Sequence, residues 1–221
     1  MSACVDILGG GSPLMERFCQ ETSSAVRIRA ALGYVFLSGL TPVWDALESS
    51  GAELQFLIGN VAGQQTDEQR AAAADAEGAL ASALDVAASA RAARARVVAE
   101  TAAAIRSNLA HIEHTGDNKR LLMGLTQGIA LNRIRVRIYP DGRLHSKCYL
   151  FERAESAVAI VGSSNITLPS PDNPTELNVV VHDPASVAAI GVWFDGLWSA
   201  SQDFSRDLFS ELSTAWPFTG A

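Results

Sequence analysis

The stretch that decides the fold is 143-RLHSKCYLFERAESAVAIVGSSNITLPSPDNPTELNVVV-181. Its apolar runs, at about 144–151, 157–162 and 177–182, have the length and composition of short buried strands. Four polar side chains stand in or beside these runs: His145, Lys147, Asn165 and Glu176. Polar and charged groups are costly to bury without partners, so we expect these four to gather at a site.

His145 and Lys147 are two residues apart, and residues two apart on a strand point to the same side. Leu144, Ser146 and Cys148 then take the other side, where Cys148 is a core residue. A lone buried histidine is more often structural than catalytic. The neighbouring lysine changes this interpretation, because two cationic groups side by side need an anion close to them.

The turn that follows the second run is Gly162-Ser163-Ser164-Asn165. A glycine lets the backbone approach a ligand closely, and Ser163 and Asn165 supply neutral donors. Turns are rich in these residues, so the turn alone is a weak signal. Glu176 is either an acid at a strand edge or an acceptor that fixes the tautomer of a histidine. Together these groups predict a phosphate site with a nucleophile, donors and an orienting carboxylate.

The pattern His145-x-Lys147 followed by Gly162-Ser163-x-Asn165 resembles the HKD motif of the phospholipase D superfamily, and "TELNVVV" matches the acid and asparagine found downstream in that family. More narrowly, the chain resembles the single-motif phospholipase D-like domains of bacterial helicase-associated, restriction-like and anti-phage proteins. The motif aspartate of the family falls at Glu152, a conservative change at a position that is largely structural. The resemblance implies a mixed α/β sheet flanked by helices.

The resemblance also implies a mechanism. His145 would attack phosphorus to give a phosphohistidine, a second histidine would protonate the leaving oxygen, and Lys147 and Asn165 would stabilise the developing charge. Glu176 would hold His145 in the attacking tautomer, and no metal or other cofactor is needed. Residues 1 to 140 contain no second HxK pattern. We therefore expect a homodimer with one composite active site on its twofold axis.

The remaining chain is interpreted as a single domain over 1–221. We expect a helix and a strand between residues 15 and 37, a helix over 41–51 with Thr41 as N-cap, and a strand over 52–60, which together make a parallel β-α-β unit. Alanine supplies 19 of the 40 residues from 71 to 110, which predicts one or two long helices within a helical insertion at about 67–114. A further helix, over 117–132, is expected to bury Leu121, Leu122, Leu125 and Ile129.

A strand over 133–139 and the turn signal "PDG" at 140–142 predict a hairpin with the strand that holds His145. The stretch 184–204 predicts a helix that buries Trp193, Phe194 and Trp198, and residues 202–221 predict a surface helix and a loose end. The three cysteines form neither a disulfide framework nor a metal-binding pattern, which favours a reducing cytoplasm. No run of about 18 apolar residues exists, so no membrane span is expected.

The charge is uneven. Residues 118–150 hold seven basic residues and one acid, Asp141, for a local charge of +6, whereas the whole chain carries −7. The basic face formed by Arg133, Arg135, Arg137 and Arg143 is either a solvated strand face or a phosphate track. The interpretation we favour is a metal-independent DNA endonuclease, acting in defence or DNA processing, with a helicase or other defence subunit as a possible partner. The alternatives are a DNA-binding module with little activity and a phospholipid phosphodiesterase.

Overall fold

The computed structural model describes residues 5–9, 12–33, 37–59, 83–141, 144–164 and 176–215. Its centre is an eight-stranded mixed sheet with the strand order β1-β7-β6-β5-β2-β3-β4-β8. The strands are β1 (Val5–Gly9), β2 (Arg27–Leu32), β3 (Glu53–Ile58), β4 (Ile134–Ile138), β5 (Lys147–Glu152), β6 (Ala157–Gly162), β7 (Leu177–Val181) and β8 (Gln202–Asp203).

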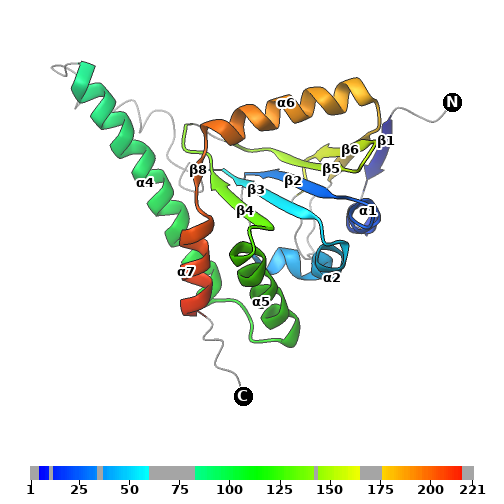
Figure 1. Ribbon diagram of the computed structural model, residues 1–221, viewed down its shortest axis with the longest axis horizontal. Helices are drawn as coiled ribbons and strands as arrows, with labels where there is room; N and C mark the ends of the chain where they lie inside the picture. The colour runs from blue at the N-terminus through cyan, green and yellow to red at the C-terminus, as the bar shows by residue number, and fades with distance from the viewer. Residues whose placement is uncertain are drawn as a thin grey trace.

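Helices cover both faces of the sheet. They are α1 (Ser12–Thr22), α2 (Thr41–Ser50), α4 (Ala83–Ala110), α5 (Gly116–Ala130), α6 (Pro184–Ala200) and α7 (Ser205–Ala215), with a short 3₁₀ turn, η1 (Leu37–Leu40), before α2. Figure 1 shows α6 across one face, α1, α2 and α5 on the other, and α4 along the side of the molecule beside α7. The main core lies between the sheet and the α1–α2–α5–α7 side, and a smaller cluster lies under α6.

The predicted β-α-β unit is confirmed, because β2 and β3 pair in parallel and α2 connects them. Gly51 ends α2 in the left-handed conformation, with φ 66°. The predicted N-cap is wrong. Thr41 is already inside the helix, and its hydroxyl donates to Oδ1 of Asn118 at 2.8 Å instead of capping the backbone.

The predicted hairpin at 140–142 is also wrong. β4 pairs in parallel with β3 and antiparallel with β8, whereas β5 pairs antiparallel with β2 and β6. The chain between β4 and β5 therefore crosses the ends of β3 and β2 before it enters the sheet. This crossing carries His145 over the ends of those two strands.

The helix predicted over 117–132 forms as α5 and buries the four expected apolar residues. Its two glycines have packing roles: a Cβ at Gly124 would overlap the ring of Trp44, and one at Gly128 would overlap the side chain of Ile134. Residues 83–110 of the Ala-rich segment form α4, and the part before residue 83 lies outside the described residues.

The C-terminal part differs from expectation in two places. Phe194 is buried under α6 and Trp198 is half-buried, but Trp193 is 41% exposed. The surface helix predicted in the tail is in fact anchored, because Leu208 and Leu212 of α7 are buried against the core. Its two-residue neighbour β8 extends the sheet beyond β4. No helix among the described residues is long and apolar enough to cross a membrane.

Candidate active site

The segment 144–146 reaches its position because two glycines make room for it. Gly33 follows β2, and its N–H donates to the carbonyl oxygen of Ser146 at 2.9 Å. A Cβ at Gly33 would lie 2.9 Å from the Leu144 oxygen and 3.0 Å from Cα of His145, and a Cβ at Gly59, after β3, would overlap the same oxygen. Side chains at these two positions would push His145 out of place. The sequence signal for this role is a glycine directly after each of two parallel strands.

His145 and Lys147 lie side by side, as their spacing predicts. Nζ of Lys147 is 3.0 Å from Nε2 and 3.4 Å from Nδ1 of His145. The histidine is exposed, whereas Lys147 is 7% exposed. In the parts of the chain that the structure describes, no carboxylate forms an ion pair with Lys147. Among the described residues, the site therefore presents an accessible imidazole beside a buried cation that forms no ion pair.

Burial lowers the pKa of Lys147, because removal of water penalises the ammonium form. The negative charge of Glu176 acts in the opposite direction and raises that pKa in part. This charge interaction places Glu176 in the electrostatic environment of the pair. No hydrogen bond joins Glu176 to His145 among the residues described here, so its role in fixing the tautomer stays a prediction.

The turn after β6 is held to β7 by its first serine. The N–H of Ser163 donates to the oxygen of Leu177 at 3.1 Å, and the Ser163 hydroxyl accepts from the N–H of Leu177 at 3.0 Å. Because Leu177 follows Glu176, these bonds fix the turn beside the predicted carboxylate. The Ser163 hydroxyl is thus hydrogen-bonded to the backbone of Leu177, and its role in binding phosphate stays a prediction.

A second set of contacts to this turn uses Asn178, the asparagine of "TELNVVV", whose hydrogen bonds the sequence did not indicate. Its amide nitrogen donates to the hydroxyl of Ser164 at 2.7 Å, and its amide oxygen accepts from the N–H of Ser164 at 3.3 Å. The hydroxyl of Tyr149 also donates to the Ser164 oxygen, at 3.2 Å. Asn165 lies outside the described residues, but the residue before it is held from three sides. A polar residue inside the apolar run "LNVVV" was the available signal.

Two of the predicted phosphate-track arginines are engaged within the protein. Arg135 forms an ion pair with Glu53, and Arg137 donates to the Ser201 oxygen at 2.6 Å while its guanidinium lies 5.4 Å from the centre of the Trp198 ring. Arg133 is half-buried just before β4, and Arg143 lies outside the described residues. The alternation of the strand is confirmed, whereas the phosphate track stays a prediction.

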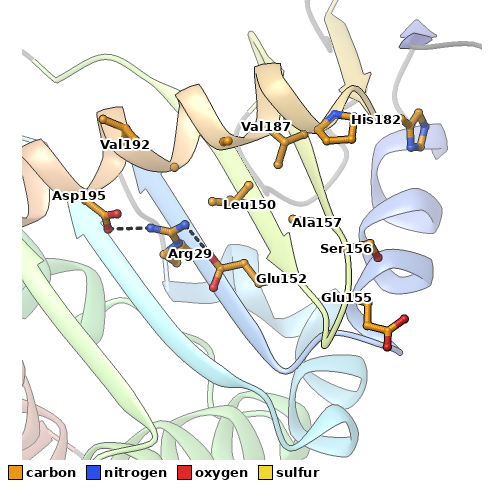
Figure 2. A pocket seen from close by; sticks show the side chains of 13 residues that line it. Arg29, Leu150, Glu152, Glu155, Ser156, Ala157, His182, Val187, Val192 and Asp195 are labelled. Atoms are coloured by element: carbon orange, nitrogen blue, oxygen red, sulfur yellow. Dashed lines mark hydrogen bonds and ion pairs between the residues drawn. The ribbon is translucent and has the colours of Figure 1, made fainter.

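Glu152 occupies the position at which the resemblance places the motif aspartate, and its contacts are with residues that hold the fold together. It lies at the end of β5 away from Lys147 and forms ion pairs with Arg27 and Arg29. Arg29 is also bonded to Oδ1 of Asp195 on α6 at 2.8 Å (Figure 2). The group therefore ties β2, β5 and α6 together beside a cavity of about 360 Å³.

Comparison with known proteins decides the family. The family model described as "Cardiolipin synthase, PLD-like domain" matches residues 76–198, more than half of the chain. The chain belongs to the phospholipase D superfamily. This membership confirms the family and fold that the motif residues suggested, and it makes the protein a phosphodiesterase-type enzyme of the phospholipase D class.

Solved structures are similar to this chain at low sequence identity. Phosphatidylserine synthase from Haemophilus influenzae Rd KW20 is 12% identical, with a TM-score of 0.52, over 95% of this chain and 44% of its own. Nuc, a phospholipase D family member from Salmonella typhimurium, is 14% identical, with a TM-score of 0.47, over 90% of this chain and 97% of its own. NucT from Helicobacter pylori is 10% identical, with a TM-score of 0.46, over 90% and 98%. No curated protein sequence is significantly similar to the chain.

Proposed function

We propose that this phospholipase D-type enzyme is a metal-independent DNA endonuclease with His145 as its nucleophile. The observation that carries the proposal is the pairing of an exposed imidazole with a buried lysine that no described carboxylate neutralises. A phosphodiester oxyanion supplies the missing negative charge and brings phosphorus next to the ring. Lys147 then stabilises the charge that builds up on the non-bridging oxygens.

The proposed reaction has two displacements at phosphorus. A nitrogen of His145 attacks, the P–N bond forms and the bond to the leaving oxygen breaks, with a proton supplied to that oxygen by a second histidine. The same second histidine then takes a proton from water, whose oxygen attacks phosphorus, breaks the P–N bond and regenerates His145. Because the sequence holds one HxK pattern, we propose that the second histidine comes from a second copy of the chain in a homodimer.

The preference for DNA rests on charge. The +6 stretch that ends in the site residues is suited to a polyanion, in a chain whose net charge is −7. A polyanion contacts many basic groups at once, whereas a lipid headgroup occupies only the site itself. Association with a helicase or defence complex, and location in the cytoplasm, rest on the resemblance and on cysteine usage alone.

A lipid phosphodiester is the second candidate, and one observation favours it. Val161, Val179 and Ile7 lie in one row across β6, β7 and β1, and Leu177 is on the same face. Ile7 is 72% exposed and Leu177 56%, so an apolar surface adjoins the segment that carries Glu176.

The deciding experiment is a cleavage assay on single- and double-stranded DNA in excess EDTA, with the His145→Ala variant in parallel and phosphatidylglycerol vesicles as a second substrate. We expect the wild-type protein to cut DNA and the variant not to cut it. Lipid turnover without DNA cleavage would replace the proposal with the second candidate. DNA binding by both proteins without cleavage would point to a binding module. Light scattering on the active protein tests the dimer, since an active monomer contradicts it.

A further inference from the structure

Among the described side chains of helix α4, the buried ones lie in the second half of the helix. Val98, Thr101, Ile105, Leu109 and Ile112 are buried at intervals of three and four residues, which marks one continuous face from α4 into the turn after it. Contact with α7, reinforced by an ion pair between Arg106 and Glu211 at 2.5 Å, holds this half in place. Toward its N-terminus the helix stands away from the rest of the molecule (Figure 1).

In the N-terminal part of α4, arginines lie on the same side of the helix as the buried residues of its second half. Residues 94 and 91 lie one and two turns before Val98, so Arg94 and Arg91 share the side that faces the protein. Arg96 points to a different side and lies 3.5 Å from Glu100. The stretch 86–99, which we call the basic arm, contains these three arginines and no aspartate or glutamate.

A two-point ion pair fixes the basic arm near the active site. Nε of Arg94 lies 2.5 Å from Oδ1 of Asp141, and its Nη2 donates to Oδ2 at 2.8 Å. Asp141 is in the connection between β4 and β5, four residues before His145. The basic arm therefore lies at the end of the sheet at which residues 144–146 cross the ends of β2 and β3.

Arg91 differs from Arg94 in its surroundings. It is exposed, and no acidic group within the described ranges forms an ion pair with it. Arg135 and Arg137, in contrast, are already bonded to Glu53 and Ser201. Arg91 on the arm is thus open to an anionic ligand, as is Lys147 at the site.

We propose that the inner face of the basic arm, Arg91 with Arg94, is a second phosphate-contacting surface that holds the DNA backbone beside the phosphodiester to be cut. This inference rests on the proposed DNA substrate. Asp141 competes with the phosphates for Arg94 in the free protein. When DNA binds, the Arg94 guanidinium exchanges one carboxylate for a phosphate, and Arg91 gains its first anionic partner.

The test measures affinity for a fluorescent 20-base-pair duplex by anisotropy between 50 and 200 mM salt, all in the His145→Ala background so that the duplex stays intact. For Arg91→Ala we expect weaker binding. The slope of log K plotted against log salt concentration should become less steep by about 0.9, the value for one lost phosphate contact. The matched control is Arg96→Ala, on the same helix but a different side, for which we expect no change in slope. Helix content by circular dichroism should not fall in either variant, because alanine is the best helix former.

A gain of function gives a second, independent readout. Asp141→Asn frees Arg94, so we expect tighter binding at 50 mM salt, by about threefold for an exposed charge interaction. The double variant Arg94→Ala/Asp141→Asn should show no such gain. If the parent protein binds DNA but Arg91→Ala matches Arg96→Ala, or Asp141→Asn fails to tighten binding, the arm has no phosphate role and the proposed function stands. If the parent protein shows no salt-dependent binding, both the DNA substrate and the arm proposal are wrong.

Discussion

Lys147 and Arg29 are two equally buried cations on neighbouring strands, and their surroundings differ completely. Each is 7% exposed, and they point to opposite faces of the sheet. Arg29 is neutralised by Glu152 and Asp195 (Figure 2), and it lies over the ring of Phe194, with 5.1 Å to the ring centre. Lys147 lies beside the imidazole of His145, and no described carboxylate forms an ion pair with it.

The difference shows how to separate a structural charge from a functional one. A buried charge that is neutralised by protein groups has little remaining affinity for a ligand. A buried cation without an anion lowers the stability of the fold, so it is retained where function needs it. By this criterion the Arg29 group is structural, and we predict that the Lys147 group binds substrate. The criterion uses partners and burial alone, so substitutions at the two positions should have opposite effects.

The largest expected effect is on catalysis at Lys147. Replacement by methionine keeps the length of the side chain but removes the charge, and we expect kcat to fall by about 10²- to 10³-fold, as for loss of one group that stabilises transition-state charge. Thermal stability should stay the same or rise, because the variant no longer buries an uncompensated ammonium. Turnover assays and thermal melting check the two parts. A variant that melts lower and remains active would make Lys147 a structural residue.

Arg29→Met should show the reverse pattern. It leaves Glu152 and Asp195 without their shared cation, and loss of one partner of a buried pair costs about 3 kcal/mol. For a chain of this length that lowers the melting temperature by about 6–12 °C, while kcat per folded molecule is retained. Arg27→Met is the matched control, since its side chain is 45% exposed and its loss should cost under about 1 kcal/mol. Equal losses for both variants would contradict the comparison.

A third comparison contrasts a glycine beside His145 with one on the solvent side of α6. A methyl group at Gly33 meets the backbone of Leu144 and His145, whereas one at Gly196 meets nothing within 4 Å. We expect Gly33→Ala to lower kcat by at least about tenfold through displacement of His145, because small misplacements of reacting groups are costly. Gly196→Ala should keep full activity and stabilise the helix by about 0.5–1 kcal/mol. Wild-type activity in Gly33→Ala would show that the crossing segment tolerates the shift.

The sequence predicted the parts of this fold that local patterns determine. Apolar runs located β5, β6 and β7, and the spacing of His145 and Lys147 placed their side chains together. It failed where distant contacts decide. Thr41 bonds to Asn118, 77 positions away, instead of capping its own helix. The turn signal at 140–142 suggested a hairpin because nothing local shows that β4 belongs beside β3.

The same limit applies to the candidate site, whose catalytic roles stay a prediction. The motif residues were recognisable, but the groups that position them are defined by tertiary contacts: Gly33 and Gly59 against the Leu144 oxygen, and Asn178 against Ser164. Charge patterning was incomplete, since it identified the arginines of β4 without showing that Glu53 and Ser201 already bind two of them. A count of basic residues cannot distinguish a free guanidinium from a paired one.

The smallest expected effect concerns pH and isolates the contribution of Glu176. Lys147 stabilises phosphate charge only as an ammonium, so activity should fall as pH rises through its lowered pKa. Glu176 raises that pKa, and Glu176→Gln should therefore move the basic limb of the pH–rate profile to lower pH. Folding stability changes in the other direction: because the folded pKa is below the usual 10.5, stability is lost as pH falls through it and is largest with the lysine neutral.

Two controls separate this effect from a general change in the enzyme. Glu155→Gln removes an exposed carboxylate at the opposite end of β5, and its profile should match that of the wild type. Lys147→Arg keeps its charge at every accessible pH, so its basic limb should disappear even if its rate is lower. The ¹³C shift of Lys147 Cε reports the same titration without turnover. If that shift titrates identically in wild type and Glu176→Gln, Glu176 exerts no field on the lysine, and any loss of rate in the variant must come from its hydrogen bonding to His145 in the reacting complex.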